Sequence, residues 1–123
     1  MTSVSQYMLR GGLALAPVDT AQTAAQTMRS LNVDALPVCS DGRLLGMLTA
    51  RDLTISAVAR GLAPGEVRIG ELMSANPVRC FEDEPVEAVL CRARAAAAHR
   101  VPVVDRSGRL VGMLLVGEEA SHA

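Results

Sequence analysis

The sequence predicts a mixed α/β (α+β) fold built from two tandem copies of one small unit. Two observations support this prediction. One stretch of the sequence recurs about 65 residues later, and in both copies an Ala-rich stretch with helical spacing precedes two short apolar runs. Each copy is therefore expected to contain a strand, a helix, two strands and a helix. At about 60 residues one copy buries too little surface to be comfortably stable alone, so we expect the two to pack as a pseudo-twofold pair.

The recurring stretches are Leu36–Leu48 and Val101–Leu114. They align at an offset of 65 residues before the turn that each contains and 66 residues after it, so the second turn is longer by one residue. Farther upstream, Tyr7–Met8 corresponds to Leu72–Met73 at the offset of 65. The correspondence in order and spacing indicates that the chain repeats one structural unit.

The chain has 123 residues, which fits one domain or two very small ones. We divide it into a first repeat, residues 1–61, and a second repeat, residues 62–123, with Gly61–Gly65 as the linker. Aromatic residues make up only 2% of the chain, so the core must be built from Ala, Leu, Val and Met. A formal net charge of −1 removes the basic field that nonspecific nucleic-acid binding depends on.

Helices are predicted at three places. Thr20 is an expected N-cap for Ala21–Leu31, and acidic residues with Pro85 precede Val86–Ala98, which suits the positive end of a helix dipole. The third helix is expected at Ala50–Arg60. In the first helix, helical spacing is shown by Ala21, Ala24, Ala25 and Met28. In the third, the positions expected to be buried are Leu53, Ile55, Val58 and Ala59.

Two strand–turn–strand signals complete the pattern, one in each repeat. Their apolar runs are Leu36–Cys39 with Leu44–Thr49, and Val101–Asp105 with Leu110–Val116. The last of these is the longest apolar run in the chain, and it falls far short of the about 20 residues that a membrane span needs. We therefore expect a cytoplasmic protein that does not bind membranes.

The three cysteines Cys39, Cys80 and Cys91 are odd in number and lack the C-x-x-C spacing of zinc and redox motifs. We interpret them as buried thiols in a reducing compartment. An alternative is a redox-responsive or metal-responsive protein that uses the cysteines with His99. No metal site is predicted.

The residues Ala35–Val38, a turn and Gly46–Leu53 resemble a CBS domain, and His99–Asp105 with Gly108–Gly112 resemble the same family. Two copies in tandem resemble the CBS pair called a Bateman module. This resemblance implies a sensor or regulator that binds an adenosine-containing ligand, such as AMP, ADP, ATP or S-adenosylmethionine, in a cleft between the paired units. It also implies a homodimer.

The resemblance places the ligand at Thr49 and Asp52, within the family pattern G-h-h-T-x-x-D. There the aspartate would accept hydrogen bonds from both ribose hydroxyls, and the threonine would assist at the ribose or phosphate. The alternative is that Thr49 only caps the following helix and Asp52 lies in its first turn.

In the family, basic residues for the phosphate come from the partner repeat, and here the corresponding residues are His99 and Arg100. Met47 and Val78 would supply apolar walls for the adenine, with ordinary core packing as the alternative for each. A mirror-related site would have Leu115 and Glu118 in place of the threonine and aspartate, and Asp34–Ala35 in place of the basic pair. One nucleotide per chain is therefore the prediction.

The sequence contains no H-E-x-x-H, Walker, G-x-S-x-G or G-x-G-x-x-G pattern. The absence of these patterns predicts a non-catalytic protein that requires no cofactor, and the resemblance implies a regulatory module that signals to an unidentified protein partner. Two other interpretations stay open: a ligand-free dimerisation or interaction module, and an enzyme whose site the sequence does not reveal.

Overall fold

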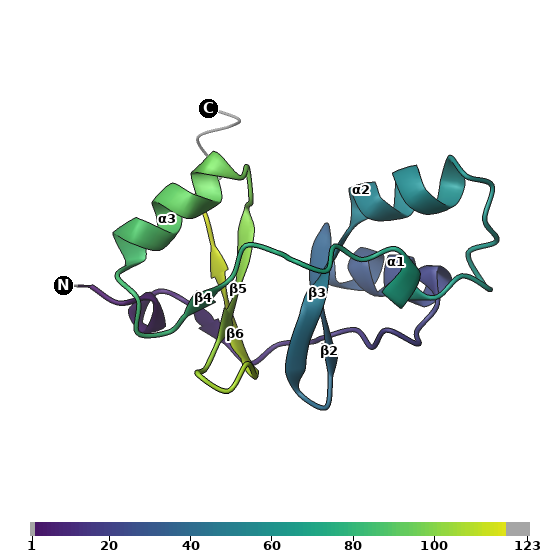
Figure 1. Cartoon of the computed structure of the whole chain (residues 1–123). Helices are drawn as coiled ribbons and strands as arrows, with labels where there is room; N and C mark the ends of the chain where they lie inside the picture. Colours follow the sequence, from purple (N-terminus) through teal and green to yellow (C-terminus); the bar gives the residue numbers. More distant parts are fainter. Residues whose placement is uncertain (1, 118–123) are drawn as a thin grey trace. The chain divides into compact units, whose positions relative to one another are not determined.

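The computed structural model describes residues 2–117 and confirms the mixed α/β fold (Figure 1). The chain divides into two compact units. We call them the terminal unit, which contains residues 2–12 and 78–117, and the central unit, residues 13–77.

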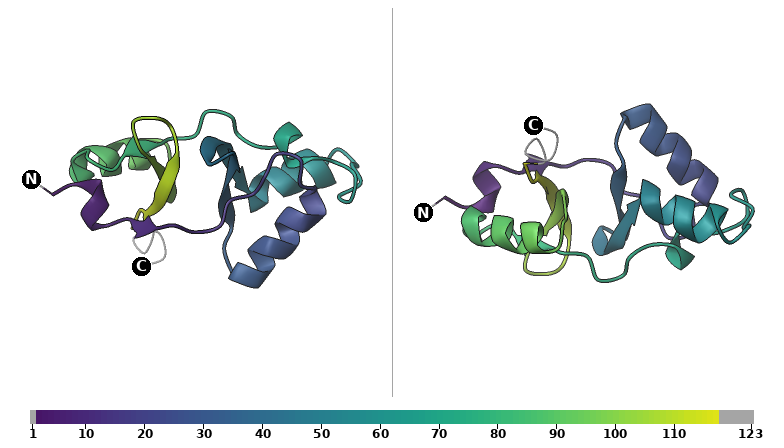
Figure 2. Two further views of the ribbon diagram at one scale, coloured as in Figure 1. Left: turned by 90° about the horizontal axis from the view of Figure 1, so that it is seen from below. Right: turned by 90° about the horizontal axis from the view of Figure 1, so that it is seen from above.

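The terminal unit has one four-stranded sheet in the order β1-β6-β5-β4, with β4 parallel to β5 and the other neighbours antiparallel. Helix α3 packs on one face of this sheet, where Val89 and Ala93 share a core with Val101, Val103 and Leu114 (Figure 2). The elements of this unit are η1 (Val4–Gln6), β1 (Leu9–Arg10), β4 (Cys80–Phe81), α3 (Val86–Ala95), β5 (Arg100–Val104) and β6 (Leu110–Leu115).

The central unit has one antiparallel hairpin, in which Leu36 pairs with Leu48. Its core joins this hairpin to α1 through Ala24 and Met28 and to η2 through Ala57. The elements of this unit are α1 (Ala21–Leu31), β2 (Ala35–Ser40), β3 (Arg43–Thr49), α2 (Ala50–Asp52), the π-helical segment η2 (Leu53–Val58) and η3 (Ile69–Glu71).

Each compact unit contains residues from both sequence repeats. Val4 in η1 belongs to the first repeat, yet its N–H donates to the carbonyl oxygen of Glu84 at 2.9 Å, ahead of α3. The equivalent Ile69 in η3 donates to the carbonyl oxygen of Asp19 at 2.8 Å, ahead of α1. The leading segment of each repeat therefore completes the unit that holds the other repeat's hairpin.

Because each unit takes residues from both repeats, the chain does not pass between the units at the linker expected between the repeats. Gly61–Gly65 lies inside the central unit, where the Pro64 carbonyl oxygen accepts a hydrogen bond of 2.9 Å from the N–H of Gln22 in α1. The chain passes between units after Gly12 and after Pro77.

The helix α1 has the predicted bounds, and Thr20 caps it by accepting a hydrogen bond from the N–H of Thr23 at 3.2 Å. Ala25, one of the residues at helical spacing, is exposed. It lies outside the row formed by the buried Ala21, Ala24 and Met28. The helix α3 ends at Ala95, three residues before the predicted end.

The predicted third helix continues from α2 into η2, and its expected buried face was largely wrong. Ile55 is 55% exposed and Val58 is 70% exposed, and Ala59 is also exposed. Leu53 is partly buried and Ala57 is fully buried, so this pair faces the core. The wider π-helical turn changes which residues align along the helix, and the α-helical spacing did not predict it. The final helix expected in the second repeat would lie largely at residues 118–123, outside the described residues.

The first strand expected in each repeat is very short. In the terminal unit it is β4, and in the central unit it is a single parallel bridge between Leu15 and Val38. Both lead into a turn closed by a carboxylate: Glu84 accepts a hydrogen bond from the N–H of Phe81, and Asp19 accepts one from the N–H of Ala16, each at 2.9 Å.

In the terminal unit an arginine reinforces this turn. Arg92 of α3 donates to Glu84 at 2.9 Å and 3.3 Å and to the carbonyl oxygen of Arg79 at 2.8 Å. The hydrogen bonds from Arg92 lower the pKa of the Glu84 carboxyl below its ordinary value, more than burial raises it. This contact ties the helix to the turn that precedes it.

We expect Glu84→Gln to lower the free energy of unfolding by about 1 kcal/mol at neutral pH, because it removes a charge-assisted contact at a partly exposed site. The lowered pKa fixes the sign of the pH dependence. The ionised carboxyl stabilises the fold above the unfolded pKa of about 4.3, and this contribution is lost as pH falls through the folded pKa.

Urea denaturation from about pH 7 to about pH 3 tests this expectation, with the difference between wild type and variant shrinking on acidification. Asp105, whose pKa is lowered chiefly by a hydrogen bond from Ser107, is present in both proteins and cancels in the difference. A difference that stays constant or grows toward low pH contradicts the assigned role of Glu84.

Candidate functional site

The turn from β3 into α2 holds Thr49 and Asp52 in a reciprocal pair of hydrogen bonds. Thr49 Oγ1 accepts from the N–H of Asp52 at 3.0 Å, and Asp52 Oδ2 accepts from the N–H of Thr49 at 2.9 Å. Both residues are partly buried. The structure thus contains the capping arrangement that was the alternative to ligand binding.

Capping leaves part of each side chain available. Within the described residues, the Thr49 hydroxyl donates no hydrogen bond and Asp52 Oδ1 accepts none. A hydroxyl can donate one hydrogen bond, and a carboxylate oxygen can accept more than one. The two residues therefore form a fixed polar surface on which a ligand with hydroxyl groups could bind.

The strand that leads to this turn is approached closely by another segment. Met47 and Ser74 exchange backbone hydrogen bonds of 3.0 Å and 2.8 Å. At Gly46 an added Cβ would collide with the carbonyl oxygen of Ser74 and come within 3.1 Å of the sulfur of Met73. Glycine at position 46 is therefore required by the close approach of a backbone.

The terminal unit repeats this contact at Gly112, where an added Cβ would lie 2.6 Å from the carbonyl oxygen of Leu9 and 3.1 Å from the sulfur of Met8. The repeat in the sequence aligns Met8 with Met73 but does not show what either residue contacts. The structure shows that each methionine covers the hairpin glycine of the other repeat.

The expected apolar walls lie in different units. Met47 pairs with Pro37 in the hairpin and is only 7% exposed, so little of its side chain is accessible to a ligand. Val78 is partly buried and packs against the core of the terminal unit. Met47 is therefore largely covered, whereas Val78 is only partly covered.

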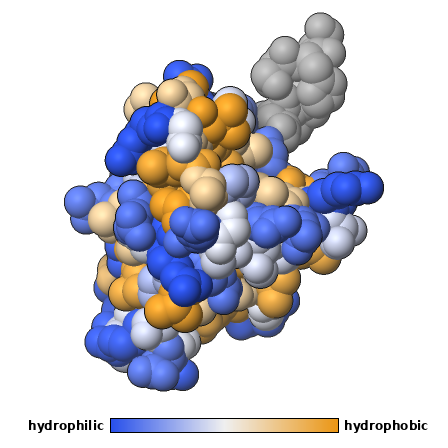
Figure 3. Space-filling model, turned by 90° about the vertical axis from the view of Figure 1, so that its right-hand side faces the viewer, coloured by the Kyte–Doolittle hydropathy of each residue, from blue (hydrophilic) through white to orange (hydrophobic). Residues whose placement is uncertain are grey.

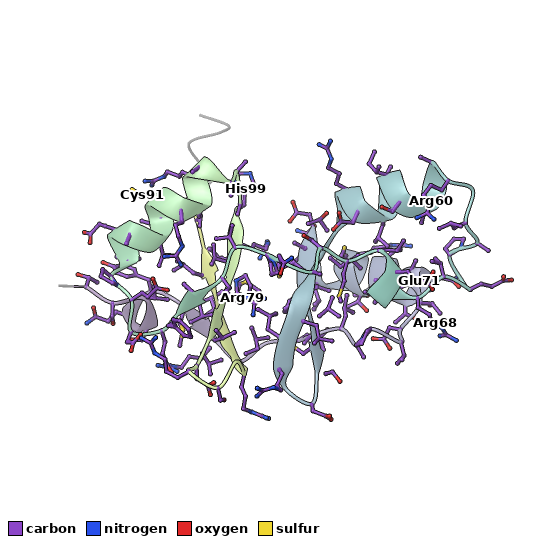
Figure 4. All side chains as sticks on the ribbon, viewed as in Figure 1. Arg60, Arg68, Glu71, Arg79, Cys91 and His99 are labelled. Atoms are coloured by element: carbon purple, nitrogen blue, oxygen red, sulfur yellow. The ribbon has the colours of Figure 1, made fainter. Side chains whose placement is uncertain are left out.

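The expected phosphate-binding residues also lie in the terminal unit. His99 is exposed and is labelled near the start of β5 in Figure 4, and its carbonyl oxygen accepts from the N–H of Val116 at 2.8 Å. Arg100 is partly buried and pairs with Leu115. The structure thus brings Met47, Thr49 and Asp52 together in the central unit, whereas Val78, His99 and Arg100 belong to the terminal unit.

In each unit, the residue just before the first hairpin strand lies beside the turn at the end of the second. Asp34 occupies this place in the central unit, and its carbonyl oxygen accepts from the N–H of Ala50 at 2.8 Å. The matching backbone bond in the terminal unit joins His99 to Val116. Asp34 and His99 therefore occupy equivalent positions in the two units.

The three cysteines are free and differ in burial. Burial raises the pKa of the Cys80 thiol to about 11 and also raises that of Cys39, so both are poor nucleophiles at neutral pH. Cys91, expected to be buried, is exposed on the outer face of α3 (Figure 4), because Val89 and Ala93 form the inner face. Among residues 2–117 no three His, Cys, Asp or Glu side chains form a group that could hold a metal ion.

The CBS domain family matches residues 4–57 and 69–118. This chain belongs to the CBS domain family. The two matches follow the sequence repeats, and they cover most of the chain. In the part of the chain that the structure describes, no helix is both long enough and apolar enough to cross a membrane.

Two relatives of this CBS pair match nearly its whole length. Hypoxic response protein 1 of Mycobacterium tuberculosis is 34% identical over 99% of this chain and 85% of the relative. The CBS domain-containing protein YhcV of Bacillus subtilis is 35% identical over 98% of this chain and 84% of the relative.

Solved structures agree with the fold. The crystal structure of Hypoxic Response Protein I with two coordinated zinc ions has a TM-score of 0.86 and 34% identity over 99% of both chains. The CBS domain pair of protein MJ0100, in complex with 5-methylthioadenosine and S-adenosyl-L-methionine, has a TM-score of 0.82 and 28% identity over 98% of both chains. The resemblance seen in the sequence is therefore confirmed for the family and the fold.

The close approach at the hairpin glycine of this CBS pair leads to a stability prediction. We expect Gly46→Ala to lower the free energy of unfolding by about 1–3 kcal/mol, because the new methyl group must displace a backbone carbonyl.

The matched control is Gly65→Ala, where the nearest atom to an added Cβ is the end of the flexible Gln22 side chain at 3.2 Å. Chemical denaturation measures both variants. Equal stability of the two variants contradicts the assigned role of Gly46.

Proposed function

We propose that this CBS pair is a non-catalytic regulatory module that binds one adenosine-containing nucleotide per chain and signals to a protein partner. In this proposal Thr49 and Asp52 bind the ribose, His99 and Arg100 bind the phosphate, and the accessible edges of Met47 and Val78 contact the adenine. The reciprocal hydrogen bonds of Thr49 and Asp52 are the observation that carries the proposal.

The capping arrangement supports ligand binding rather than competing with it. Because Thr49 and Asp52 hold each other, their side chains are ordered before a ligand arrives, and less conformational entropy is lost on binding. Asp52 Oδ1 can accept from ribose hydroxyls while Oδ2 keeps its bond to the backbone. A CBS pair of the same fold is known in complex with S-adenosyl-L-methionine and 5-methylthioadenosine, which both contain adenosine.

The first test is a thermal-shift panel of AMP, ADP, ATP, S-adenosylmethionine and NAD on wild type and Asp52→Ala. A ligand at 100 times its Kd should add about 2.7 kcal/mol of stability. We expect this stabilisation with at least one ligand and its loss in the variant. Asp41→Asn, at the exposed hairpin turn, is the control for a general loss of charge.

Asp52→Ala also removes one of the capping bonds, so its fold must be compared with that of Asp52→Asn, which keeps an acceptor oxygen at the same place. If both variants are folded and both lose the ligand, the carboxylate charge is required for binding. An Arg100→Gln variant then separates the ligand classes, because it should weaken phosphate-bearing nucleotides about tenfold or more and S-adenosylmethionine less. Failure of every ligand to stabilise the wild type contradicts the proposal.

The exposed apolar side chains of η2 favour self-association as a second role. Ile55 and Val58 both project into solvent from this segment. Figure 3, which views the side of the molecule that carries α2 and η2, shows apolar groups interspersed with polar ones. A protein–protein interface would remove these apolar side chains from water.

We expect the wild type to form a homodimer through η2 and the Val58→Glu variant to be monomeric, because a charge there would have to be buried in the interface. Light scattering measures the molar mass of both proteins. Val18→Glu, at an apolar residue equally exposed but outside η2, is the control. A wild type that remains monomeric at high concentration contradicts this role.

A further inference from the structure

We propose that residues 2–10 exchange between two copies of this chain, so that the terminal unit of each copy holds the segment of the other. The partner is a second copy of the chain, and the binding surface is the one that residues 2–10 already occupy. The exchange uses different residues from the association through η2, and it needs no ligand. Three features of the molecule support it: the segment folds as one piece, its connection is a flexible turn, and a second copy offers the same contacts.

Residues 2–10 form a small piece with hydrogen bonds of its own. The N–H of Met8 donates to the carbonyl oxygen of Val4 at 2.9 Å. The side-chain oxygen of Gln6 accepts from the N–H of Ser3 at 3.2 Å. Because these bonds join near neighbours, they stay with the segment when it leaves its site.

The segment is bound to the rest of the terminal unit on two sides. On one side the N–H of Val4 donates to the carbonyl oxygen of Glu84 at 2.9 Å, beside the start of α3 (Figure 2). On the other side β1 pairs with β6. Val4 is fully buried and Met8 is only 8% exposed, so the segment can leave only when part of the core opens. We therefore expect the exchange to be slow.

The connection to the central unit is an exposed turn that contains two glycines. Gly11 has a φ of 74° and Gly12 a φ of 106°, and an added Cβ at either would meet nothing within 4 Å. Among the described residues, Gly12, Leu13 and Ala14 take part in no hydrogen bond, and Leu13 is 52% exposed. Glycine has access to many backbone conformations. The chain can therefore change direction here without breaking other contacts.

The other crossing between the units is stiffer. After Ser74 the chain passes through Ala75, Asn76 and Pro77 and has no glycine there. Proline fixes its own φ and also restricts the residue before it. This difference identifies Gly11–Gly12 as the hinge of the exchange.

A second copy offers an identical site, so exchange keeps the contacts of the segment and changes only the turn. The cost is the freedom lost when two chains associate, and its effect diminishes as protein concentration rises. In the closed form, each segment stays on its own unit. Gly11 and Gly12 favour this form because glycine accepts a positive φ without strain. The exchanged dimer is therefore expected to be a minor species that grows with concentration.

The role of the hinge is tested with Gly12→Ala in the Val58→Glu background, which removes association through η2 as a source of dimers. Alanine is strained at the φ of the closed turn and relaxed in an extended connection, so the exchanged dimer should increase about fivefold or more. Size-exclusion chromatography with light scattering measures the dimer fraction after prolonged incubation at high concentration.

The matched control is Gly61→Ala in the same background. Gly61 also has a positive φ, 71°, and open space around it, but it lies inside the central unit. The strain is thus similar, and the dimer fraction should stay unchanged. Equal dimer fractions in Gly12→Ala and Gly61→Ala overturn the inference.

Disulfide trapping identifies the exchanged residues. Ser3 and Pro85 lie directly opposite each other in an antiparallel bridge, flanked by the hydrogen bonds of Val4 and Val86. Such a pair places its Cα atoms about 4.5 Å apart, within the range of a disulfide. An isotope-labelled Ser3→Cys chain is therefore mixed with an unlabelled Pro85→Cys chain under oxidised glutathione, each with Cys91→Ser to remove the exposed thiol.

We expect a covalent dimer of one labelled and one unlabelled chain, joined between positions 3 and 85, with a higher yield when Gly12→Ala is added. Ser30→Cys, at an exposed serine of α1, replaces Ser3→Cys to measure random collisions. With Ser3→Cys and Pro85→Cys in one chain, the disulfide should form within that chain and prevent the Gly12→Ala dimer. A yield between chains no higher than that of the Ser30→Cys control overturns the inference.

Discussion

The close contact between a hairpin glycine and the backbone of a segment from the other repeat is the constraint on which the rest of the fold depends. Ser74 bonds to Met47 beside Gly46, and the equivalent Leu9 lies against Gly112. A side chain at either glycine would separate two backbones that exchange hydrogen bonds. Because the contact joins different repeats, each unit requires residues from both, and a single repeat cut from the chain would lack its η1 or η3 partner segment.

The same contact organises the candidate site. The strand β3 is held from one side by β2 and from the other by the bridge to Ser74, and it ends at Thr49, where the hydrogen bonds with Asp52 begin. Held on both sides, the end of the strand presents its polar groups with little freedom. Rigid placement of a few polar groups is what recognition of a small ligand requires.

Local signals in the sequence predicted the elements that depend on neighbouring residues. Thr20 and the spacing of the alanines predicted α1 with its observed bounds, and Thr49 with Asp52 formed the contact that their separation of three residues allows. Features that depend on distant residues were not predicted. The repeat showed that Met8 corresponds to Met73, but a repeat cannot show which hairpin a segment joins, so the contacts of these methionines with Gly112 and Gly46 were not predicted. The exposure of Ile55 and Val58 was missed because apolar residues in a helix were assumed to face its own core.

The two units differ at positions on which their shared packing does not depend. Each unit has a hairpin glycine, a methionine that covers it and a buried aliphatic residue, Val4 or Ile69. Both units keep these residue types because the packing depends on them. Positions outside the two cores carry no such requirement, so Ser74 and Thr49 in the central unit correspond to Leu9 and Leu115 in the terminal unit within the same fold. A duplicated unit can in this way keep one polar surface for a ligand while its copy acquires a different, apolar surface.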